Sequence, residues 1–463
     1  MNILNSYKII ALFPYHTDPS LNQAWQTTQL SLLLLPFSPL LGGLTLFINS
    51  LVLWKKYGSQ FLKSWVNRTF LILGVMMIIT TLLSDQKDAA AIGLFNFLPF
   101  FIVFIAQRFL IRETKQLREL ALMLVIPSLP IAFLAIAQII WGWTFDWKLL
   151  SFGGGSGLIF DWVLTSAKAQ CDRSTSLFYI STTLGSYLIV TFTLSLGLWV
   201  ESLNQPKFIA NRNWIGWCVW IFQSRWGLGC LFVLNAIALC LTQSRSAWGI
   251  ALSEIVILGV WTGYYWISAV TSTAIAVVAA AAYAPPPWNS SLRGISPEFI
   301  MCRMNADQDL PPITRRSGIF KFAIEMIHQR PFTGWGLRNF GPVFETATTY
   351  YIGHPHSLFL MLAAETGIPA TIVFCGLVTV IMVSGIKKVR TLQIGEEKRS
   401  LLLIIFAFLS CVAFSVFDVT IFDVRINTIG WMLLAAICGF SQHTRDSTSD
   451  RISPDYPIEI VQL

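Results

Sequence analysis

The sequence predicts an all-α membrane protein: a bundle of about 11 (10–12) transmembrane helices with one large extracytoplasmic loop. Apolar residues make up 54% of the 463 residues, charged residues only 12%, and the mean hydropathy is +0.62. Soluble proteins have roughly 25% charged residues, so a chain this poor in charge is expected to be polytopic. Long apolar runs recur along the chain, and one polar stretch at 285–354 interrupts them.

Each apolar run is long enough, or nearly so, to cross the hydrocarbon core as a helix. The first run contains Pro36, Pro39 and Gly42-Gly43, so it forms either one span or two short elements. One span places the N-terminus outside, and a pair places it inside. The expected spans are 30–54, 69–83, 89–107, 119–141, 176–200, 226–243, 246–262, 263–284, 357–386, 400–417 and 426–440.

Loop charge predicts the orientation of these spans. Lys and Arg gather in the loops at 55–68, 108–118 and 387–399, which the positive-inside rule assigns to the cytoplasm. The large loop is also basic, but loops longer than about 60 residues largely escape this rule. The segments expected outside are 84–88, 142–173, Arg245, 285–354 and 418–425.

The chain is expected to divide into N-terminal helices at 1–284, a large periplasmic loop at 285–355, C-terminal helices at 356–440 and a polar cytoplasmic tail at 441–463. Within the large loop, apolar residues follow helical spacing from Arg316 to Gln329, which predicts an amphipathic helix. Pro331 ends that helix and the glycines after it predict a tight turn. The apolar positions are Ile319, Phe320, Ala323, Ile324 and Ile327.

Composition also bounds the function. The net charge of +8 and pI of about 9.1 reflect basic cytoplasmic loops, so nucleic acid is not an expected partner. Residues 1–29 lack the pattern of a cleavable signal peptide, so the first span is expected to direct insertion. No phosphate-binding loop, dinucleotide fingerprint or nucleophile elbow is found, and no cofactor is expected. The eight cysteines lack C-x-x-C spacing; Cys171 and Cys302, both expected outside, either pair or remain thiols.

Arg245 is the first candidate for chemistry. It ends one span and begins the next without a real loop, so it is expected at or just below the outer interface. A charge there is costly unless it meets water, a carboxylate or a ligand. The alternative is an arginine that anchors a helix end by snorkelling. The string Leu241-Thr242-Gln243-Ser244-Arg245-Ser246 favours a functional role.

Three further arginines are candidates on the same side. Arg315 and Arg316 lie where the amphipathic helix begins, and a guanidinium fork matches two phosphate oxygens. They therefore either clamp a diphosphate or contact anionic lipid head groups. Arg173, before the span at 176–200, either binds the same ligand or anchors the interface.

Histidines supply the candidate base. His354 and His356 lie before the span at 357–386, and Pro355 between them allows only one to face a pocket. A neutral imidazole near pH 7 can take a proton from a hydroxyl group. Glu365 follows on the same helix, either to orient a partner or, as we favour, to serve helix packing.

Two acidic pairs contain the residue type that binds metal ions. Asp307 with Asp309, and Asp85 with Asp88, have spacings common by chance and lack further ligands nearby in sequence. We therefore interpret both pairs as solvated loop acids, and no metal site is expected.

Three blocks of sequence resemble motifs of the bacterial O-antigen ligase and polymerase family, which are multi-span enzymes that transfer lipid-linked glycans. Together they cover roughly residues 240–385. The residues 241–246 resemble the family's LTxSR span ending. A weaker fourth block contains Arg173, Ser176, Phe178, Gly185 and Tyr187. The other two blocks are Arg316 with Phe320, Ala323, Met326-Ile327, Pro331-Phe332-Thr333-Gly334-Trp335-Gly336 and Asn339-Phe340, and His354-Pro355-His356-Ser357 with Leu360 and Glu365-Thr366-Gly367-Ile368.

The resemblance implies roles for single residues. Arg245 and Arg316 would hold the diphosphate of a polyprenyl-diphosphate glycan, and His356 would be the base for the acceptor hydroxyl. Two departures stand out, because Ser357 replaces the family's usual Asn and Ser181-Thr182 replace its frequent Pro-Asn. The first bears on the orientation of His356, and the second weakens a role for Arg173.

The resemblance thus predicts an enzyme of the bacterial cytoplasmic (inner) membrane with its active site on the periplasmic side. It would transfer a glycan from the polyprenyl-diphosphate donor to a glycan, a lipid-core sugar or a protein hydroxyl, without metal. The acceptor distinguishes a ligase, which we favour, from a polymerase of the same family.

The alternative outside the enzymes is a transporter of inorganic carbon or another small anion. The charges gathered at one face and the retained histidine argue against a transporter.

Overall fold

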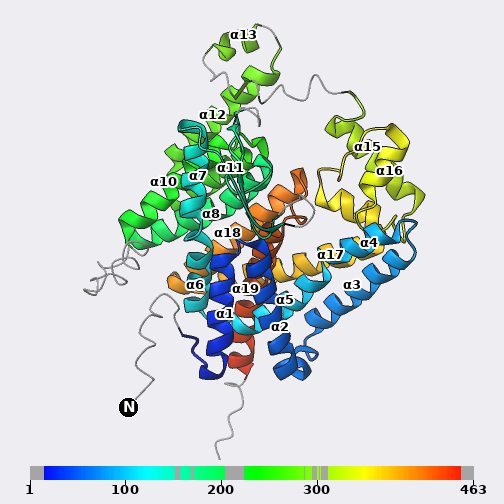
Figure 1. The fold of residues 1–463 in the computed structure, drawn as a ribbon. Helices are drawn as coiled ribbons and strands as arrows, with labels where there is room; N and C mark the ends of the chain where they lie inside the picture. Colours follow the sequence, from blue (N-terminus) through cyan, green and yellow to red (C-terminus); the bar gives the residue numbers. More distant parts are fainter. Residues whose placement is uncertain are drawn as a thin grey trace, which may run out of the picture.

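The computed structural model describes residues 15–151, 157–167, 172–203, 224–285, 287–294, 300–301, 303 and 311–449. It is a helical bundle with one β-hairpin, so the all-α fold class is confirmed (Figure 1).

The described elements follow one another from end to end of the chain. The first half contains η2 (Pro19–Leu21), α1 (Asn22–Leu34), α2 (Pro39–Phe61), α3 (Trp65–Leu82), α4 (Lys87–Leu94), α5 (Leu98–Leu110), α6 (Thr114–Val125), α7 (Ser128–Ile140), β1 (Phe145–Ser151), β2 (Gly157–Leu164) and α8 (Ser181–Leu203). The second half contains α10 (Arg225–Leu241), α11 (Arg245–Thr262), α12 (Tyr265–Tyr283), α13 (Trp288–Arg293), α15 (Arg316–Gln329), α16 (Phe340–Thr348), α17 (Leu358–Thr391), α18 (Glu396–Phe417) and α19 (Val424–Ser449).

Eight described helical stretches are long and apolar enough to cross a membrane, two of them formed by consecutive helices (α4 with α5, and α6 with α7), so the expected count of eleven is not confirmed. The other three expected runs do form helices, namely α2, α10 and α11. α10 has only 17 residues, and polar residues lower the apolarity of the other two: Lys55 and Lys56 lie in α2, and Arg245 and Glu254 lie in α11.

The first apolar run is a helical hairpin rather than one span. The hydroxyls of Ser31 in α1 and Thr45 in α2 lie 2.9 Å apart, and Asn49 Nδ2 donates to the carbonyl of Ala24. Gly42 permits the close approach, because a Cβ there would lie 2.5 Å from Leu35 Cα. With 13 residues, α1 is about 20 Å long and too short to cross alone.

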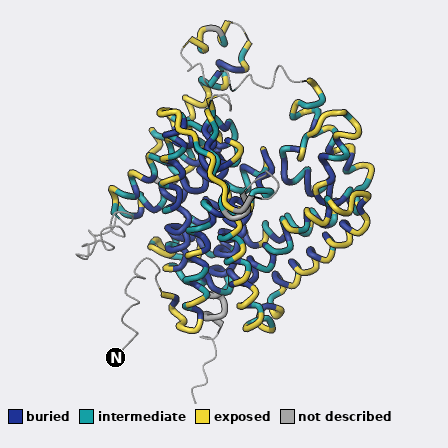
Figure 2. Tube along the Cα trace, viewed as in Figure 1, coloured by how far each residue is buried: buried dark blue, intermediate teal, exposed yellow. Residues whose placement is uncertain are grey.

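The centre of the bundle lies around α5, α8, α18 and α19 (Figure 2). In α19 the apolar window is 89% buried, whereas in α12 it is only 17% buried. A helix that is apolar all round and exposed on most sides fits contact with lipid. α12 therefore lies at the edge of the bundle, while α19 packs against α5, α17 and α18.

Two features lie outside the spans. α15 occupies the residues predicted for the amphipathic helix, and its Ile319, Ala323 and Met326 are buried while Ile324 faces outward. The β-hairpin was not predicted: β1 and β2 pair antiparallel, with Trp147 opposite Trp162. Trp162 Nε1 donates to the carbonyl of Phe37, which fastens the hairpin to the turn between α1 and α2.

Candidate active site

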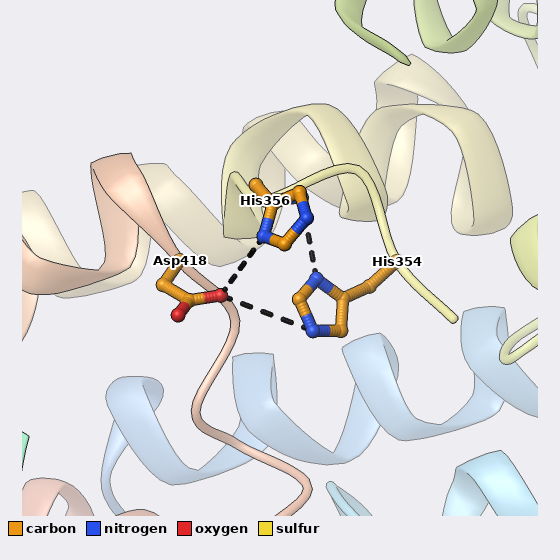
Figure 3. A group of neighbouring side chains, drawn as sticks. All are labelled: His354, His356 and Asp418. Atoms are coloured by element: carbon orange, nitrogen blue, oxygen red, sulfur yellow. Dashed lines mark hydrogen bonds and ion pairs between the residues drawn. The ribbon is translucent and has the colours of Figure 1, made fainter. Parts of the chain in front are cut away.

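Two histidines from the segment before α17 and an aspartate at the end of α18 lie close together (Figure 3). His354 and His356 lie in the segment between α16 and α17, and Asp418 ends α18. Asp418 Oδ1 lies 3.3 Å from His356 Nδ1 and 3.8 Å from His354 Nε2. His356 has a left-handed backbone, with φ of 50°. A non-glycine residue in this conformation is held by its surroundings and is typical of functional sites.

The hydrogen bonds assign the tautomers of both histidines. The backbone N–H of His356 donates to His354 Nδ1 at 3.2 Å, so the proton of a neutral His354 ring is on Nε2. Nδ1 of His356 faces the carboxylate, which accepts its proton. Nε2 of His356 is then the basic nitrogen of that ring, as in other acid–histidine pairs.

The charges of the group follow from burial and neighbours. Burial raises the pKa of Asp418, but the hydrogen bond from His356, the two imidazoles and the N–H of Val419 together outweigh it, so that the pKa is lowered. Burial, opposed by Asp418, lowers the pKa of His354 to about 4. Near pH 7 the group therefore has a carboxylate beside a neutral His354.

The same three residues are of types that bind transition metals. Their ligand atoms all lie within 4.8 Å of one another, and two imidazoles with one carboxylate are a common zinc ligand set. The absence of a metal requirement therefore stays a prediction. Of the acids weighed from sequence, Asp85 forms an ion pair with Arg330 at 2.6 Å, and Asp307 and Asp309 lie outside the described residues.

Arg245 is the first residue of α11 and is half-buried. Ser244 caps this helix, since its side chain accepts from the N–H of Ala247, and Gln243 turns the chain with a φ of 50°. The guanidinium thus lies beside the positive end of a helix dipole, which favours anions there.

Arg173 holds the turn that carries Arg245. Its Nε donates to the carbonyl of Thr242 at 3.0 Å, and the next residue, Ser174, donates its N–H to the carbonyl of Leu241. The structure therefore places Arg173 near Arg245, where the contact of Arg173 with Thr242 positions the turn before α11.

The segment containing Arg173 is itself fixed by Gln138 at the end of α7. Gln138 Oε1 accepts from the hydroxyl of Ser174 and from the N–H groups of Thr175 and Ser176. Its Nε2 donates to the carbonyl of Thr165 and to the hydroxyl of Thr175. One buried amide therefore satisfies several backbone groups at once, as buried polar groups require.

Arg425 joins this segment to the loop that begins at Asp418. It is 7% exposed, pairs with Asp423 at 2.7 Å, and donates to the carbonyl of Leu177 at 2.9 Å. Its guanidinium also lies 3.8 Å from the centre of the Phe178 ring. The turn of Arg245 and the histidine pair are thus connected through contiguous contacts at one end of the bundle.

Arg315 and Arg316 lie on a separate part of the molecule. α15 packs against α17, whereas α11 packs against α8, α12 and α18. Figure 1 shows α11 and α15 on opposite sides, with α18 drawn between them. Arg315 is exposed, and the side chain of half-buried Arg316, the first residue of α15, forms no hydrogen bond or ion pair with the residues that the structure describes. No direct contact among the described residues joins Arg316 to the histidines.

Glu365 is a structural carboxylate. It is 1% exposed, and its two oxygens accept from the N–H groups of Arg338, at 2.8 Å, and Phe340, at 3.1 Å. These donors lie at the start of α16, so Glu365 fixes that helix against α17. The preference for packing over catalysis agrees with this geometry.

The segment Pro331–Gly336 packs directly on the backbone of α17. The N–H groups of Trp335 and Gly336 donate to the carbonyls of Ala364 and Glu365. A Cβ at Gly334 would lie 2.4 Å from the carbonyl of Glu365, and one at Gly367 equally near Phe332. Gly367 has a φ of 79° and bends α17. The glycines of both motifs are therefore required by a close backbone contact.

Sequence reasoning missed Asp418, Arg425 and Gln138. Asp418 lies in the segment 418–425, which was expected between two spans. Its position as a carboxylate at the end of an apolar run is the feature of the sequence that could have identified it as a candidate. Ser357, which replaces the family's Asn, is the N-cap residue of α17 without a side-chain capping bond. Cys171 and Cys302 lie outside the described residues.

The comparisons agree with the motifs. Residues 230–375 match the family model described as O-Antigen ligase, which confirms the resemblance over this part of the chain. The match covers α10 to the middle of α17, including Arg245, Arg316 and both histidines. No curated protein matches the chain. The family and the apolar helices together define a multi-pass membrane protein of glycan transfer.

Glu365→Gln tests the structural role of this carboxylate. The amide turns one acceptor into a donor that faces a backbone N–H, which lowers the free energy of unfolding by about 1–3 kcal/mol. Thermal unfolding in detergent measures the effect, with Glu345→Gln, the same change at an exposed position of α16, as the control of unchanged stability. Equal melting temperatures for the two variants would contradict the role.

The low pKa of His354 predicts a pH-dependent stability. The folded-state pKa of about 4 is below the ordinary value of 6.5, so protons bind the unfolded chain more strongly between these values. This contribution to stability is present above pH 6.5 and is lost as the pH falls toward 4. Melting curves over this range should show a smaller decline for His354→Gln than for the wild type; parallel declines would rule the effect out.

Proposed function

We propose that this protein is an inner-membrane glycosyltransferase of the O-antigen ligase type. The donor is a glycan on a polyprenyl diphosphate, and the acceptor is a hydroxyl of a glycan, a lipid-core sugar or a protein at the periplasmic face. The observation that carries the proposal is the pairing of His356 with Asp418 in a chain that matches the O-antigen ligase family over residues 230–375.

His356 acts as the general base in this proposal. Asp418 accepts the Nδ1 proton of His356 and so selects the tautomer in which Nε2 of the neutral ring is the proton acceptor, and in this proposal Nε2 faces the acceptor hydroxyl. Nε2 takes the hydroxyl proton while the oxygen forms a bond to the anomeric carbon. The bond from that carbon to the diphosphate oxygen breaks, so the product has the inverted configuration.

Arginines stabilise the leaving group. Arg245 and Arg316 are each the first residue of a helix, where the guanidinium and the free backbone N–H groups both favour anions. Negative charge grows on the diphosphate as it departs, and fixed cations in a partly dry site lower that barrier. Because α18 lies between α11 and α15 in Figure 1, the two arginines would approach the diphosphate from different sides. Arg315 assists from the rim, and Arg173 acts through the turn of Arg245.

Orientation supports the periplasmic assignment. The histidine pair, Asp418 and the turn at Arg245 lie in segments that the positive-inside rule assigns to the outside. The diphosphate of a lipid-linked glycan is held at this interface, so the reaction needs cations there and no nucleotide.

Arg245→Ala and His356→Ala should each reduce surface glycan by at least about a hundredfold, because each removes a group that acts in the transition state. The measurement sizes both the lipid-linked and the surface-attached glycans at matched protein levels, with Arg68→Ala as a control in the expected cytoplasmic loop. Accumulation of long lipid-linked chains would indicate a ligase, and single repeats a polymerase. Unchanged pools in a strain without a redundant enzyme would refute the proposal.

Metal independence is tested on purified protein. We expect transfer to persist in EDTA, since the arginines supply the positive charge that a cation would provide. Added Zn²⁺ should inhibit, because the histidines and Asp418 can bind it in place of the proton. Loss of activity in EDTA with recovery on adding a divalent metal would show instead that these residues hold a catalytic ion.

A further inference from the structure

A buried carboxyl group lies deep in the bundle, below the candidate active site. Glu254 belongs to α11 and is 6% exposed. Its Oε2 accepts a hydrogen bond from the hydroxyl of Thr193 in α8 at 2.6 Å, and its Oε1 accepts one from the hydroxyl of Ser410 in α18. One side chain therefore joins three helices, and no step of the proposed reaction uses it.

The two hydroxyl groups have acceptors without Glu254. Thr193 Oγ1 lies 2.8 Å from the carbonyl of Ile189 in its own helix. Ser410 Oγ lies 2.9 Å from the carbonyl of Phe406, also in its own helix. A hydroxyl has one proton, and serine and threonine in helices can donate it to the carbonyl four residues earlier. An apolar side chain at position 254 would therefore leave neither hydroxyl proton without an acceptor.

Stability does not account for the acid at position 254. Burying a carboxyl group costs free energy, and apolar residues that replace buried polar or ionic groups are often neutral or stabilising. Buried polar groups do fix the arrangement of helices in some proteins, because their hydrogen bonds are directional whereas apolar contacts tolerate sliding. The helices that Glu254 joins therefore indicate its role.

Two of these helices carry residues of the proposed reaction. α11 begins at Arg245, nine residues before Glu254, and α18 ends at Asp418, eight residues after Ser410. At about 1.5 Å per residue, the contact lies about 14 Å along α11 from Arg245 and about 12 Å along α18 from Asp418. Glu254 and Ser410 thus join the two helices at similar depths below the ends that carry the candidate site.

Glu254 adds a second point of attachment to α11. The first is at the start of the helix, where Arg173 donates to the carbonyl of Thr242. One contact leaves a helix free to tilt and rotate about it, whereas a second contact about 14 Å further along restrains both motions. This restraint matters for a reaction, because a displacement of about 1 Å between reacting groups can cost a hundredfold in rate.

We propose that Glu254 is a positioning residue, which holds α11 against α18 so that Arg245 is aligned with His356 and Asp418. The inference rests on the proposed function, since the alignment concerns the diphosphate and the base. Glu254 itself does not contact the substrate and acts through the two helices.

Two substitutions separate the hydrogen bonds of Glu254 from the size of its side chain. Glu254→Gln keeps one acceptor oxygen and adds an N–H donor, so both hydroxyls keep a partner at this position. Glu254→Met keeps an unbranched chain of similar length and removes both hydrogen bonds. We expect Glu254→Met to lower kcat about tenfold with KM for the donor unchanged, and Glu254→Gln to retain most of the wild-type kcat.

Gln107 supplies the matched control. It is fully buried in α5, accepts from Thr28 of α1 at 3.0 Å and donates to Ser50 of α2 at 3.4 Å, so it also joins three helices. None of these helices carries a residue of the candidate site. Gln107→Met should therefore keep the wild-type kcat. Wild-type kcat in Glu254→Met, an equal loss in Gln107→Met, or a loss that only follows a lower melting temperature would each overturn the proposal.

Ser410→Ala tests the contact from the other helix and does not depend on the folding of Glu254→Met. It should lower kcat severalfold, whereas Ser253→Ala, which removes a hydroxyl bonded to Gly249 within α11, should not. Combining Ser410→Ala with Glu254→Met should cost no more than Glu254→Met alone, because both remove the same contact. Fully additive losses would contradict a shared role.

Pulsed electron paramagnetic resonance measures the arrangement without any glycan transfer. A genetically encoded spin-labelled residue at Val260 in α11 and at Val416 in α18, both exposed, leaves the eight natural cysteines in place. The distance distribution should be narrow in the wild type and in Glu254→Gln, and broader or displaced in Glu254→Met. An unchanged distribution in Glu254→Met would overturn the positioning role. A changed distribution in a protein whose wild type transfers no glycan would reject the proposed function and keep the helix contact.

Discussion

The arrangement of this site depends on one carboxylate. Asp418 is 9% exposed, and it ends α18 at a place where water is scarce. Its charge is tolerated because His356 and the N–H of Val419 surround it with donors. In return it fixes the imidazole of His356 and brings the segment before α17 onto the loop before α19. The base and its carboxylate consequently belong to one unit.

The motif residues divide into scaffold and chemistry. Glu365, the glycines of Pro331–Gly336 and Gly367 make a close backbone contact between the large loop and α17. Arg173 holds the turn before α11 through the carbonyl of Thr242. His356, Arg245 and Arg316 are the residues that act on the substrate in our proposal. A motif therefore shows that particular residues are needed at these positions, and only their contacts show whether they are needed for the fold or for the reaction.

The need to satisfy buried polar groups explains why many residues at this end of the bundle have a structural role. Gln138 satisfies the backbone of the Arg173 segment, and Arg425 connects that segment to the loop after Asp418. Backbone groups near the hydrocarbon core must find partners within the protein. The same contacts that remove this cost also hold Arg245 and His356 in fixed positions relative to the bundle.

The sequence by itself determined the fold class, the amphipathic helix at 316–329, the family and the two histidines as candidates. These follow from local properties, namely apolar runs, helical spacing and short motifs, which need no partner from elsewhere in the chain. Span counting was less successful, because α10 has only 17 residues and charged residues lie in α2 and α11. Only the tertiary structure decided that Asp418 pairs with His356, that Arg173 positions the turn of Arg245 and that α15 lies apart from α11. The first two depend on contacts between residues 62 and 69 positions apart, and the third depends on α15 packing against α17; all three are set by how whole helices pack.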